Sequence, residues 1–113
     1  MTATRPVEKA VYEQVCYLLR LAGCKVYRLA QARASSQSPG LPDLWVFGPG
    51  PRFAWVEVKR PGGRLRPDQR QFRELCQARR IEHLVGGIDE VTRLLSRWGL
   101  IGSDGVLRPE KSG

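Results

Sequence analysis

The sequence predicts an α/β domain in which a helix, three strands, a second helix, a fourth strand and a last helix follow one another. Two observations support this fold class. Apolar residues recur with helical spacing in three segments, and short runs rich in Val, Phe, Trp or Leu lie between them. With 113 residues, 42% hydrophobic and 27% charged, the chain has the size and composition of one globular domain. We expect that domain over residues 1–98 and a loosely ordered tail over residues 99–113.

The N-terminal part predicts an amphipathic helix over residues 6–22, with Pro6 in its first turn and Gly23 at its stop. Its apolar stripe consists of Val7, Val11, Val15, Leu18, Leu19 and Ala22. A short strand is expected over residues 25–29. The next segment, AQARASSQSPG, is rich in Ser, Gly and Pro and predicts a loop.

The next two strands, residues 41–47 and 53–59, flank the five-residue loop GPGPR and predict a hairpin. If paired residues have numbers that sum to 100, aromatic residues face each other across the two strands, which favours this register. The same register sets Asp43 beside Glu57. Residues on both faces are largely apolar, so we expect inner strands that are covered on both sides. The pairs on one face are Trp45 with Trp55 and Phe47 with Phe53, and the other face carries Leu44, Val46, Ala54, Val56 and Val58.

The C-terminal part predicts two helices separated by one strand. Pro67 and Asp68 suit the positive end of a helix over residues 67–80. A short strand over residues 81–85 follows. Asp89 is expected to cap a last helix that ends at Trp98.

The net charge of +8 is unevenly distributed. Residues 59–80 alone hold eight Lys or Arg side chains against two acidic ones. A basic excess on one part of a chain is typical of a protein that binds a polyanion, nucleic acid first and an acidic membrane surface second. Generic solubilising charge is the alternative explanation.

Other classes of protein have little support. The three cysteines are scattered without a Cys-x-x-Cys spacing, so neither a disulfide framework nor a zinc site is indicated. The N-terminus lacks a signal-peptide pattern, and no apolar run approaches the length of a membrane span. We expect a protein of the reducing cytoplasm with no membrane partner and no organic cofactor.

Asp43, Glu57 and Lys59 are the candidate site. Opposed residues on paired strands have side-chain roots about 5 Å apart, where two carboxylates repel unless a divalent cation lies between them. Oxygen ligands of this kind suit Mg²⁺ or Mn²⁺. Lys59 lies two residues after Glu57 and therefore on the same face of the sheet. The three groups suit metal-assisted phosphodiester hydrolysis, although an exposed ion pair at a strand end is an alternative.

These residues resemble the VRR-Nuc family of the PD-(D/E)XK nuclease superfamily. GLPDLWVF is similar to the family's Gly-x-Pro-Asp strand, WVEVKRPGGRL to its Glu-x-Lys strand and following loop, and LRPDQRQF to its Leu-x-x-x-Gln helix start. The resemblance covers roughly residues 6–95. It implies a restriction-endonuclease-like core with a mixed central sheet flanked by helices. The implied activity is a Mg²⁺- or Mn²⁺-dependent DNA endonuclease.

By this resemblance, Asp43 and Glu57 are metal ligands together with the backbone carbonyl of Val58, and Lys59 is the catalytic lysine. Gln69 is implied near the scissile phosphate or Lys59, with an early-helix surface residue as the alternative.

Four further residues have a functional and a structural interpretation. Glu8 matches an acidic residue that related nucleases place on the first helix near a metal or its water, and it equally suits the helix dipole. Trp45 and Trp55 could stack on bases but suit a sheet core better. His83, the only histidine, is interpreted as structural.

The candidate DNA-binding residues are arginines near the site and in the loop. At the helix start, Arg66 replaces a residue that often caps the helix and adds a charge for DNA. The loop of residues 28–38 either embraces the substrate or serves as a linker. The set comprises Arg60, Arg64, Arg66, Arg70 and Arg73 near the site, with Arg28 and Arg33 in the loop.

Short members of the family resemble stand-alone bacterial or phage forms, which are similar to Holliday-junction resolvases and tend to be homodimers. A two-fold dimer supplies two active sites for the two strands of branched DNA. We therefore expect a junction-selective homodimer. A nuclease that cuts flaps or free ends, or serves in restriction or packaging, a DNA-binding module without activity, and an RNA substrate remain alternatives.

Overall fold

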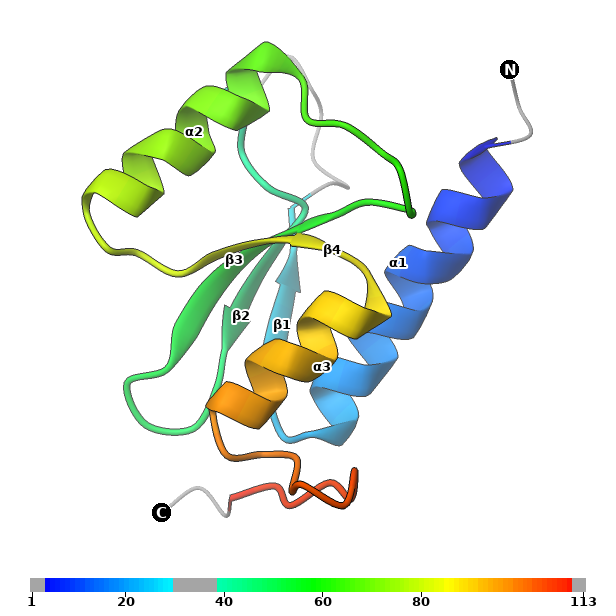
Figure 1. Cartoon of the computed structure of the whole chain (residues 1–113), viewed down its shortest axis with the longest axis vertical. Coiled ribbons are helices and arrows are strands. Elements are labelled where there is room, and N and C mark those ends of the chain that lie inside the picture. The colour runs from blue at the N-terminus through cyan, green and yellow to red at the C-terminus, as the bar shows by residue number, and fades with distance from the viewer. Residues whose placement is uncertain (1–3, 30–38, 111–113) are drawn as a thin grey trace.

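The structure is a computed structural model that describes residues 4–29 and 39–110 (Figure 1). Its elements follow the predicted order, and none of the helices within the described ranges is long and apolar enough to cross a membrane. They are α1 (Thr4–Leu21), β1 (Lys25–Arg28), β2 (Leu44–Phe47), β3 (Phe53–Val58), α2 (Pro67–Ala78), β4 (His83–Gly86) and α3 (Ile88–Arg97).

The four strands form one mixed sheet in the order β1-β2-β3-β4. The pairs β1–β2 and β2–β3 are antiparallel, and β3–β4 is parallel. The hairpin has the predicted register, with Trp45 opposite Trp55 and Phe47 opposite Phe53. The predicted α/β fold with a mixed sheet is therefore confirmed.

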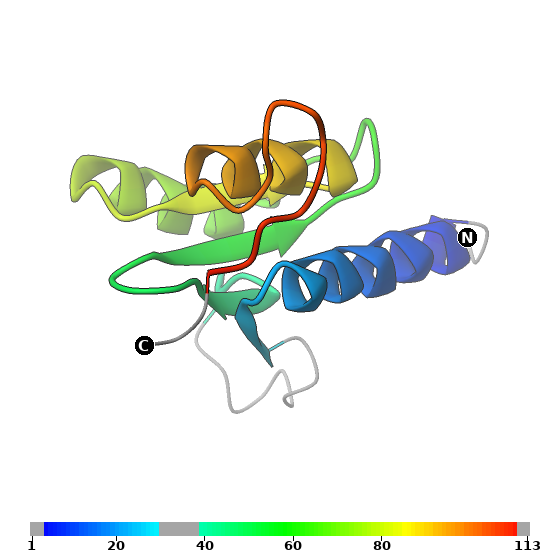
Figure 2. The same ribbon diagram turned by 90° about the horizontal axis from the view of Figure 1, so that it is seen from below.

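The hydrophobic core lies between one face of the sheet and the helices α1 and α3 (Figure 2). Because apolar residues recur every three or four positions, each helix presents a single apolar stripe to the sheet. Val15 and Leu19 of α1 and Leu94 of α3 are fully buried there. Val46 and Val56, from the inner strands, complete the packing from the sheet side.

The opposite face carries an aromatic cluster that is only partly covered. Tyr27, Trp45, Phe47, Phe53 and Trp55 form what we call the aromatic face. The expectation that both faces of the inner strands are covered was wrong for this part of the described sheet. Tyr27 is 50% exposed and Phe47 38% exposed, because no described helix packs over β1 and β2 on this side.

The helix α2 covers only the other half of that face. Its Phe72 packs edge-on against Trp55, with ring centroids 5.3 Å apart, and contacts His83 at 5.9 Å. In Figure 1 the helix stands apart from α1 and α3. The position of α2 brings its first turn beside the end of β3.

Several boundaries differ from the predicted ones. The strand β2 begins at Leu44, so Asp43 lies in a bend before it. The helix α2 ends at Ala78, followed by Arg80 with a positive φ of 59°. The helix α3 begins earlier than predicted: its cap residue is Gly87, whose N–H donates to the Glu90 side chain, so Asp89 belongs to the first turn.

The segment after α3 is packed in the structure, unlike the loosely ordered tail that the sequence suggested from residue 99. Leu100 is fully buried in the core, and its carbonyl accepts a hydrogen bond from Arg108 N–H. A bridge between Ile101 and Leu107 closes the turn. Ile101 and Leu107 are partly buried against the core.

Candidate active site

Asp43, Glu57 and Lys59 come together at the end of β3. Glu57 is 3% exposed, and its Oε2 lies 3.8 Å from the ammonium Nζ of Lys59. The Asp43 carboxylate Oδ2 accepts a hydrogen bond of 2.9 Å from the N–H of Val58, between the two other residues. The trio predicted from the sequence therefore forms one cluster.

Asp43 reaches this cluster from a bend rather than from the paired part of β2. The β2–β3 ladder ends with Leu44 opposite Val56. One residue earlier, the backbone carbonyl of Asp43 accepts a hydrogen bond of 2.7 Å from Leu29 N–H. The backbone is thus held by the end of β1 and the side chain by β3, which fixes the carboxylate from two directions.

The environment disfavours negative charge on both carboxylates. Burial, followed by the negative charge of Asp43, raises the pKa of Glu57 to about 8. Burial also raises the pKa of Asp43, against the opposing effect of its hydrogen bond from Val58. Lys59 favours the ionised form of each acid, but its attraction does not restore their ordinary pKa values.

The donor set fits a hard divalent cation. Glu57 Oε1 is buried and accepts no hydrogen bond from an N–H or O–H group of the described residues. While both acids are ionised this is costly, and either a proton shared with Asp43 or a bound cation relieves it. Two adjacent carboxylates of raised pKa are the groups whose charge a cation stabilises. No group of three His, Cys, Asp or Glu side chains with metal-binding geometry occurs in residues 4–29 and 39–110. Water, phosphate or backbone oxygens would have to complete the coordination, as is usual for Mg²⁺.

Glu8 does not join the two carboxylates in such a group. It is close enough for its charge to raise the pKa of Asp43, as the last of five contributions. Its effect on the site is therefore electrostatic in the described geometry.

Gln69 links the first turn of α2 to the site. It is 5% exposed, and its Nε2 donates a hydrogen bond of 3.0 Å to Glu57 Oε2. Its Oε1 accepts a 2.8 Å hydrogen bond from the N–H of Arg66, at the start of the helix. The resemblance implied a position near the scissile phosphate or Lys59. In the structure, Gln69 contacts the same Glu57 oxygen that lies 3.8 Å from Lys59 Nζ. It also supplies the helix cap that Arg66 lacks.

Gly40 is a site residue that the sequence reasoning passed over. It is buried, has a φ of +86°, and packs so closely on α2 that a Cβ would collide with the backbone carbonyl of Asp68. The Asp43 segment and the Gln69 turn therefore touch through this glycine. The signal was present in the Gly-x-Pro-Asp motif, in which Gly permits both a positive φ and a close approach.

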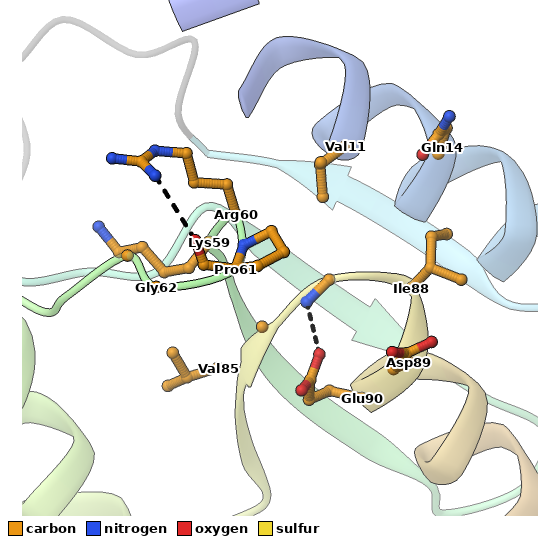
Figure 3. A pocket seen from close by; sticks show the side chains of 13 residues that line it. Val11, Gln14, Lys59, Arg60, Pro61, Gly62, Val85, Ile88, Asp89 and Glu90 are labelled. Atoms are coloured by element: carbon orange, nitrogen blue, oxygen red, sulfur yellow. Dashed lines mark hydrogen bonds between the residues drawn. The ribbon is translucent and has the colours of Figure 1, made fainter. Parts of the chain in front are cut away.

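A cavity of about 430 Å³ borders the cluster at Lys59 (Figure 3). It opens where β3 and β4 end, between α1 and the first turn of α3. Neither Asp43 nor Glu57 lines it. Its charged lining residues are Lys59, Arg60, Asp89 and Glu90, with Glu90 held by the hydrogen bond from Gly87.

Comparison with known proteins agrees with this geometry. The VRR-NUC domain model matches residues 12–87, which include Asp43, Glu57, Lys59 and Gln69. The chain belongs to the VRR-NUC domain family. A solved VRR_NUC domain structure is similar at a TM-score of 0.68 and 26% identity, over 80% of this chain and 96% of that one. A comparison with curated proteins found no match.

Membership of the VRR-NUC family gives the chain a nuclease-type fold and makes DNA its implied partner. The family match begins at Tyr12 and ends at Gly87, so it includes neither Glu8 nor α3. The recognised segment is thus the sheet, α2 and most of α1.

The arginines of the VRR-NUC domain near α2 are mostly exposed, and three are held by short-range contacts. Arg60 Nη1 donates a hydrogen bond of 3.5 Å to the Pro61 carbonyl. Arg66 Nε lies 3.3 Å from Asp68 Oδ1, and Arg70 Nη1 donates a hydrogen bond of 3.2 Å to the Leu65 carbonyl. Arg73 is half-buried, and its Nε has no hydrogen-bond partner in the described part of the chain. Positive side chains thus follow the loop and helix that lead away from Lys59, namely Arg60, Arg64, Arg66, Arg70 and Arg73.

Arg28 is engaged elsewhere. Its guanidinium forms two hydrogen bonds with the Glu13 carboxylate, at 3.1 and 2.9 Å, and lies over the Tyr12 ring at 5.2 Å. The interaction with Glu13 raises the pKa of Arg28. Its charge is therefore neutralised locally rather than presented to a ligand. Arg33 lies outside the described residues.

The remaining polar candidate, His83, lies between the sheet and α2. Burial, then the charge of Arg73, lowers its pKa, so the imidazole is neutral near pH 7. Its ring contacts Phe72 in the cluster of aromatic residues. This position agrees with the structural interpretation of His83.

Proposed function

We propose that this VRR-NUC domain is a divalent-metal-dependent endodeoxyribonuclease. The observation that carries the proposal is the buried Asp43–Glu57 pair, with the unsatisfied Glu57 Oε1 and the ammonium of Lys59 3.8 Å from the same carboxylate. A buried pair of acids costs free energy in the absence of a cation. Phosphodiester hydrolysis needs a cation, a positioned water and a positive group near the phosphate, and this site can supply all three.

Asp43 and Glu57 would hold Mg²⁺ or Mn²⁺ with the backbone carbonyl of Val58. When bound, the metal supplies Lewis-acid polarisation of the phosphate and lowers the pKa of a bound water. Lys59, whose Nζ lies 3.8 Å from Glu57 Oε2, would offset negative charge that develops on the phosphoryl oxygens. The Gln69 amide restricts the rotation of the Glu57 carboxylate by holding Oε2.

DNA is the proposed substrate because the basic segment starts at the site itself. From Lys59 to Arg80 the chain holds eight basic and two acidic side chains. Phosphate contacts from such side chains position a duplex without reading its sequence. We propose selectivity for branched DNA, including four-way junctions, and action as a homodimer, because one domain holds one active site and two strands need two.

Cleavage of a substrate panel tests the proposal. Four-way junctions, flaps, nicked duplexes and linear duplexes are incubated with the wild-type protein in Mg²⁺, Mn²⁺ or EDTA. We expect metal-dependent cutting, strongest on branched substrates. Lys59→Ala should lower the rate by about 10²–10³-fold, as loss of a charge-stabilising donor does in other enzymes. Lys25→Ala is the matched control, since it removes the same charge from an exposed position in β1, opposite Phe47 and away from the carboxylate cluster.

The alternatives give different results in the same assay. Cutting without junction preference would support a flap, end or restriction-type nuclease of the same fold. A wild-type protein that binds DNA but cuts nothing with either metal would support an inert binding module, and cleavage of RNA alone would replace DNA as the substrate.

A further inference from the structure

The start of α2 faces solvent on one side and the carboxylate cluster on the other. Arg66, at the N-cap, has a side chain that is 64% exposed, whereas Gln69, in the first turn, is 5% exposed. Gln69 Nε2 donates its hydrogen bond of 3.0 Å to Glu57 Oε2. A single helical turn therefore joins an exposed cation to a buried carboxylate of the candidate metal site.

Arg66 is linked to Gln69 by two routes. Its backbone N–H donates a hydrogen bond of 2.8 Å to Gln69 Oε1. Its side chain reaches Asp68, whose Oδ1 lies 3.3 Å from Arg66 Nε and accepts a hydrogen bond of 3.0 Å from the Gln69 N–H. One carboxylate oxygen is thus shared between a guanidinium and a backbone N–H. We propose that Arg66 is a positioning residue that couples contact with a DNA phosphate to the orientation of the Glu57 carboxylate, and hence to metal binding.

A phosphate can displace the ion pair between Arg66 and Asp68. The two side chains are 64% and 35% exposed, and ion pairs in contact with water contribute little to stability. A phosphate can instead accept two parallel hydrogen bonds from one guanidinium, which makes that contact stronger and fixes its geometry. Arg66 therefore moves from Asp68 to the backbone of a bound DNA strand.

The release of Asp68 tightens the first turn of α2. Its Oδ1 then accepts a hydrogen bond from the Gln69 N–H alone, and a carboxylate at the start of a helix stabilises that start. The Arg66 N–H still holds Gln69 Oε1, because a backbone group does not follow the guanidinium. Glu57 Oε2 is held in turn by the fixed Gln69 amide, and a carboxylate whose orientation is fixed binds a cation more tightly.

The next arginine of α2 lacks these contacts. Arg70 is exposed, and its Nη1 donates to the Leu65 carbonyl. Within residues 4–29 and 39–110, its side chain forms no hydrogen bond or ion pair with Asp68 or Gln69. The positive charge of Arg66, in contrast, lowers the pKa of Glu57, as the last of five contributions. Arg70 is therefore a phosphate contact without a link to the carboxylate.

Coupling of this kind is reciprocal, so the cation tightens DNA binding by the same factor by which DNA tightens cation binding. The inference rests on the proposed function, because it needs a cation at Asp43 and Glu57 and DNA on the basic segment. The factor is measured as the ratio of the DNA dissociation constant in EDTA to that in a divalent cation. Direct contact between a phosphate and the cation also contributes to this ratio, so matched variants must be compared.

Arg66→Gln and Arg70→Gln are the matched variants, since each removes one exposed positive charge and keeps its backbone N–H. Fluorescence anisotropy measures binding of a labelled four-way junction in EDTA and in Ca²⁺, an oxygen-binding cation of flexible geometry, at equal ionic strength. Gel electrophoresis verifies that the DNA stays intact. Both variants should bind more weakly than the wild type in EDTA. Arg70→Gln should retain the wild-type ratio, whereas Arg66→Gln should lower it at least about fivefold, the lower end of ordinary coupling.

Gln69→Ala is a second test, because it interrupts the link without removing a charge. It should lower the ratio and leave DNA binding in EDTA unchanged. Arg66→Gln added to Gln69→Ala should lower the ratio no further, because the two residues act on Glu57 through one route. A wild-type ratio near one, equal ratios in Arg66→Gln and Arg70→Gln, or additive effects in the double variant would overturn the inference.

Cleavage of the same junction in Mg²⁺ separates this inference from the proposed function. A wild-type protein that cuts the junction, while Arg66→Gln and Arg70→Gln have equal ratios, contradicts the coupling alone. An Arg66-dependent ratio in a protein that cuts nothing contradicts the nuclease alone.

Discussion

The amide Nε2 of Gln69 lies 3.0 Å from Glu57 Oε2 and donates a hydrogen bond to it, so the first turn of α2 holds one oxygen of the buried carboxylate. The other oxygen, Oε1, has no such partner among the described residues. The carboxylate is thus fixed on one side and available to a cation on the other. The Oε1 of Gln69 also accepts a hydrogen bond from the N–H of Arg66. The orientation of Glu57 therefore depends on the position of the start of α2.

Removal of this link should weaken the site without affecting DNA binding. Gln69→Ala is expected to lower cleavage about 10–100-fold, the usual cost of losing an outer hydrogen-bond partner of a metal ligand. The metal concentration for half-maximal cleavage should rise, because Glu57 loses its orientation. Gln71→Ala, two residues later on the exposed side of α2, is the control and should behave as wild type. Equal metal dependence in the two variants would contradict a positioning role for Gln69.

Local chemistry made much of the fold predictable. The alternation of aromatic and charged residues in β3 and the five-residue loop before it set the register, and the observed pairing of Trp45 with Trp55 has that register. The proximity of Asp43, Glu57 and Lys59 was predicted from this register and from the rule that every second residue of a strand lies on the same face. The N-cap of α3 was predicted wrongly, because Asp is preferred over Gly at an N-cap and Asp89 was therefore chosen. In the structure Gly87 is the cap residue, and its N–H donates a hydrogen bond to the Glu90 side chain.

Features that depend on the placement of one element against another were not predictable. Nothing local in the sequence specifies that α2 leans on β3 and β4 and leaves Phe47 and Tyr27 exposed. The hydrogen bond from Val58 to Asp43 also required the bend before β2, which interrupts the ladder. Tertiary contacts of this kind decide which apolar face of a strand is covered.

Metal binding should stabilise the fold through the two carboxylates. The expected shift in unfolding free energy is RT ln(1 + [L]/Kd), about 2.7 kcal/mol at a metal concentration of 100 Kd. Differential scanning calorimetry in EDTA and in Mg²⁺ or Mn²⁺ measures it as a rise in Tm. Asp43→Asn should abolish the rise, and Asp89→Asn, which removes an exposed acid, should retain it. A rise of equal size in both variants would assign the metal to another part of the molecule.

The raised pKa of Glu57 predicts an unusual pH dependence for the metal-free protein. The pKa of Glu57 is about 8 in the folded protein, against an ordinary value of 4.5. Between pH 4.5 and pH 8, the folded state therefore holds a proton on Glu57 that the unfolded state has lost. Stability should therefore fall as pH rises through this window, by up to roughly 1.4 kcal/mol per unit. Urea unfolding in EDTA at pH 7 and at pH 8 measures this loss of stability. Both pH values lie above the pKa of His83, which is lowered, so His83 does not titrate between them.

Glu57→Gln is the control for this pH dependence, because the amide does not titrate. The variant should lose the decrease between pH 7 and 8. Mg²⁺ should stabilise the wild type more at pH 8 than at pH 7, since a cation binds the ionised carboxylates. Stability that rises with pH in EDTA would show that Glu57 is already ionised in the folded protein.

Gly40 should be required for the contact between the Asp43 segment and α2. In Gly40→Ala the new Cβ meets the Asp68 carbonyl, so the first turn of α2 must move and carry Gln69 away from Glu57. Gly62→Ala is the matched control: its φ of +81° is close to the +86° of Gly40, but nothing lies within 4 Å of its Cβ. Both variants should lose about 1–2 kcal/mol from the left-handed backbone. Only Gly40→Ala should also lose cleavage and metal-induced stabilisation, and equal activity of the two variants would contradict the role assigned to this contact.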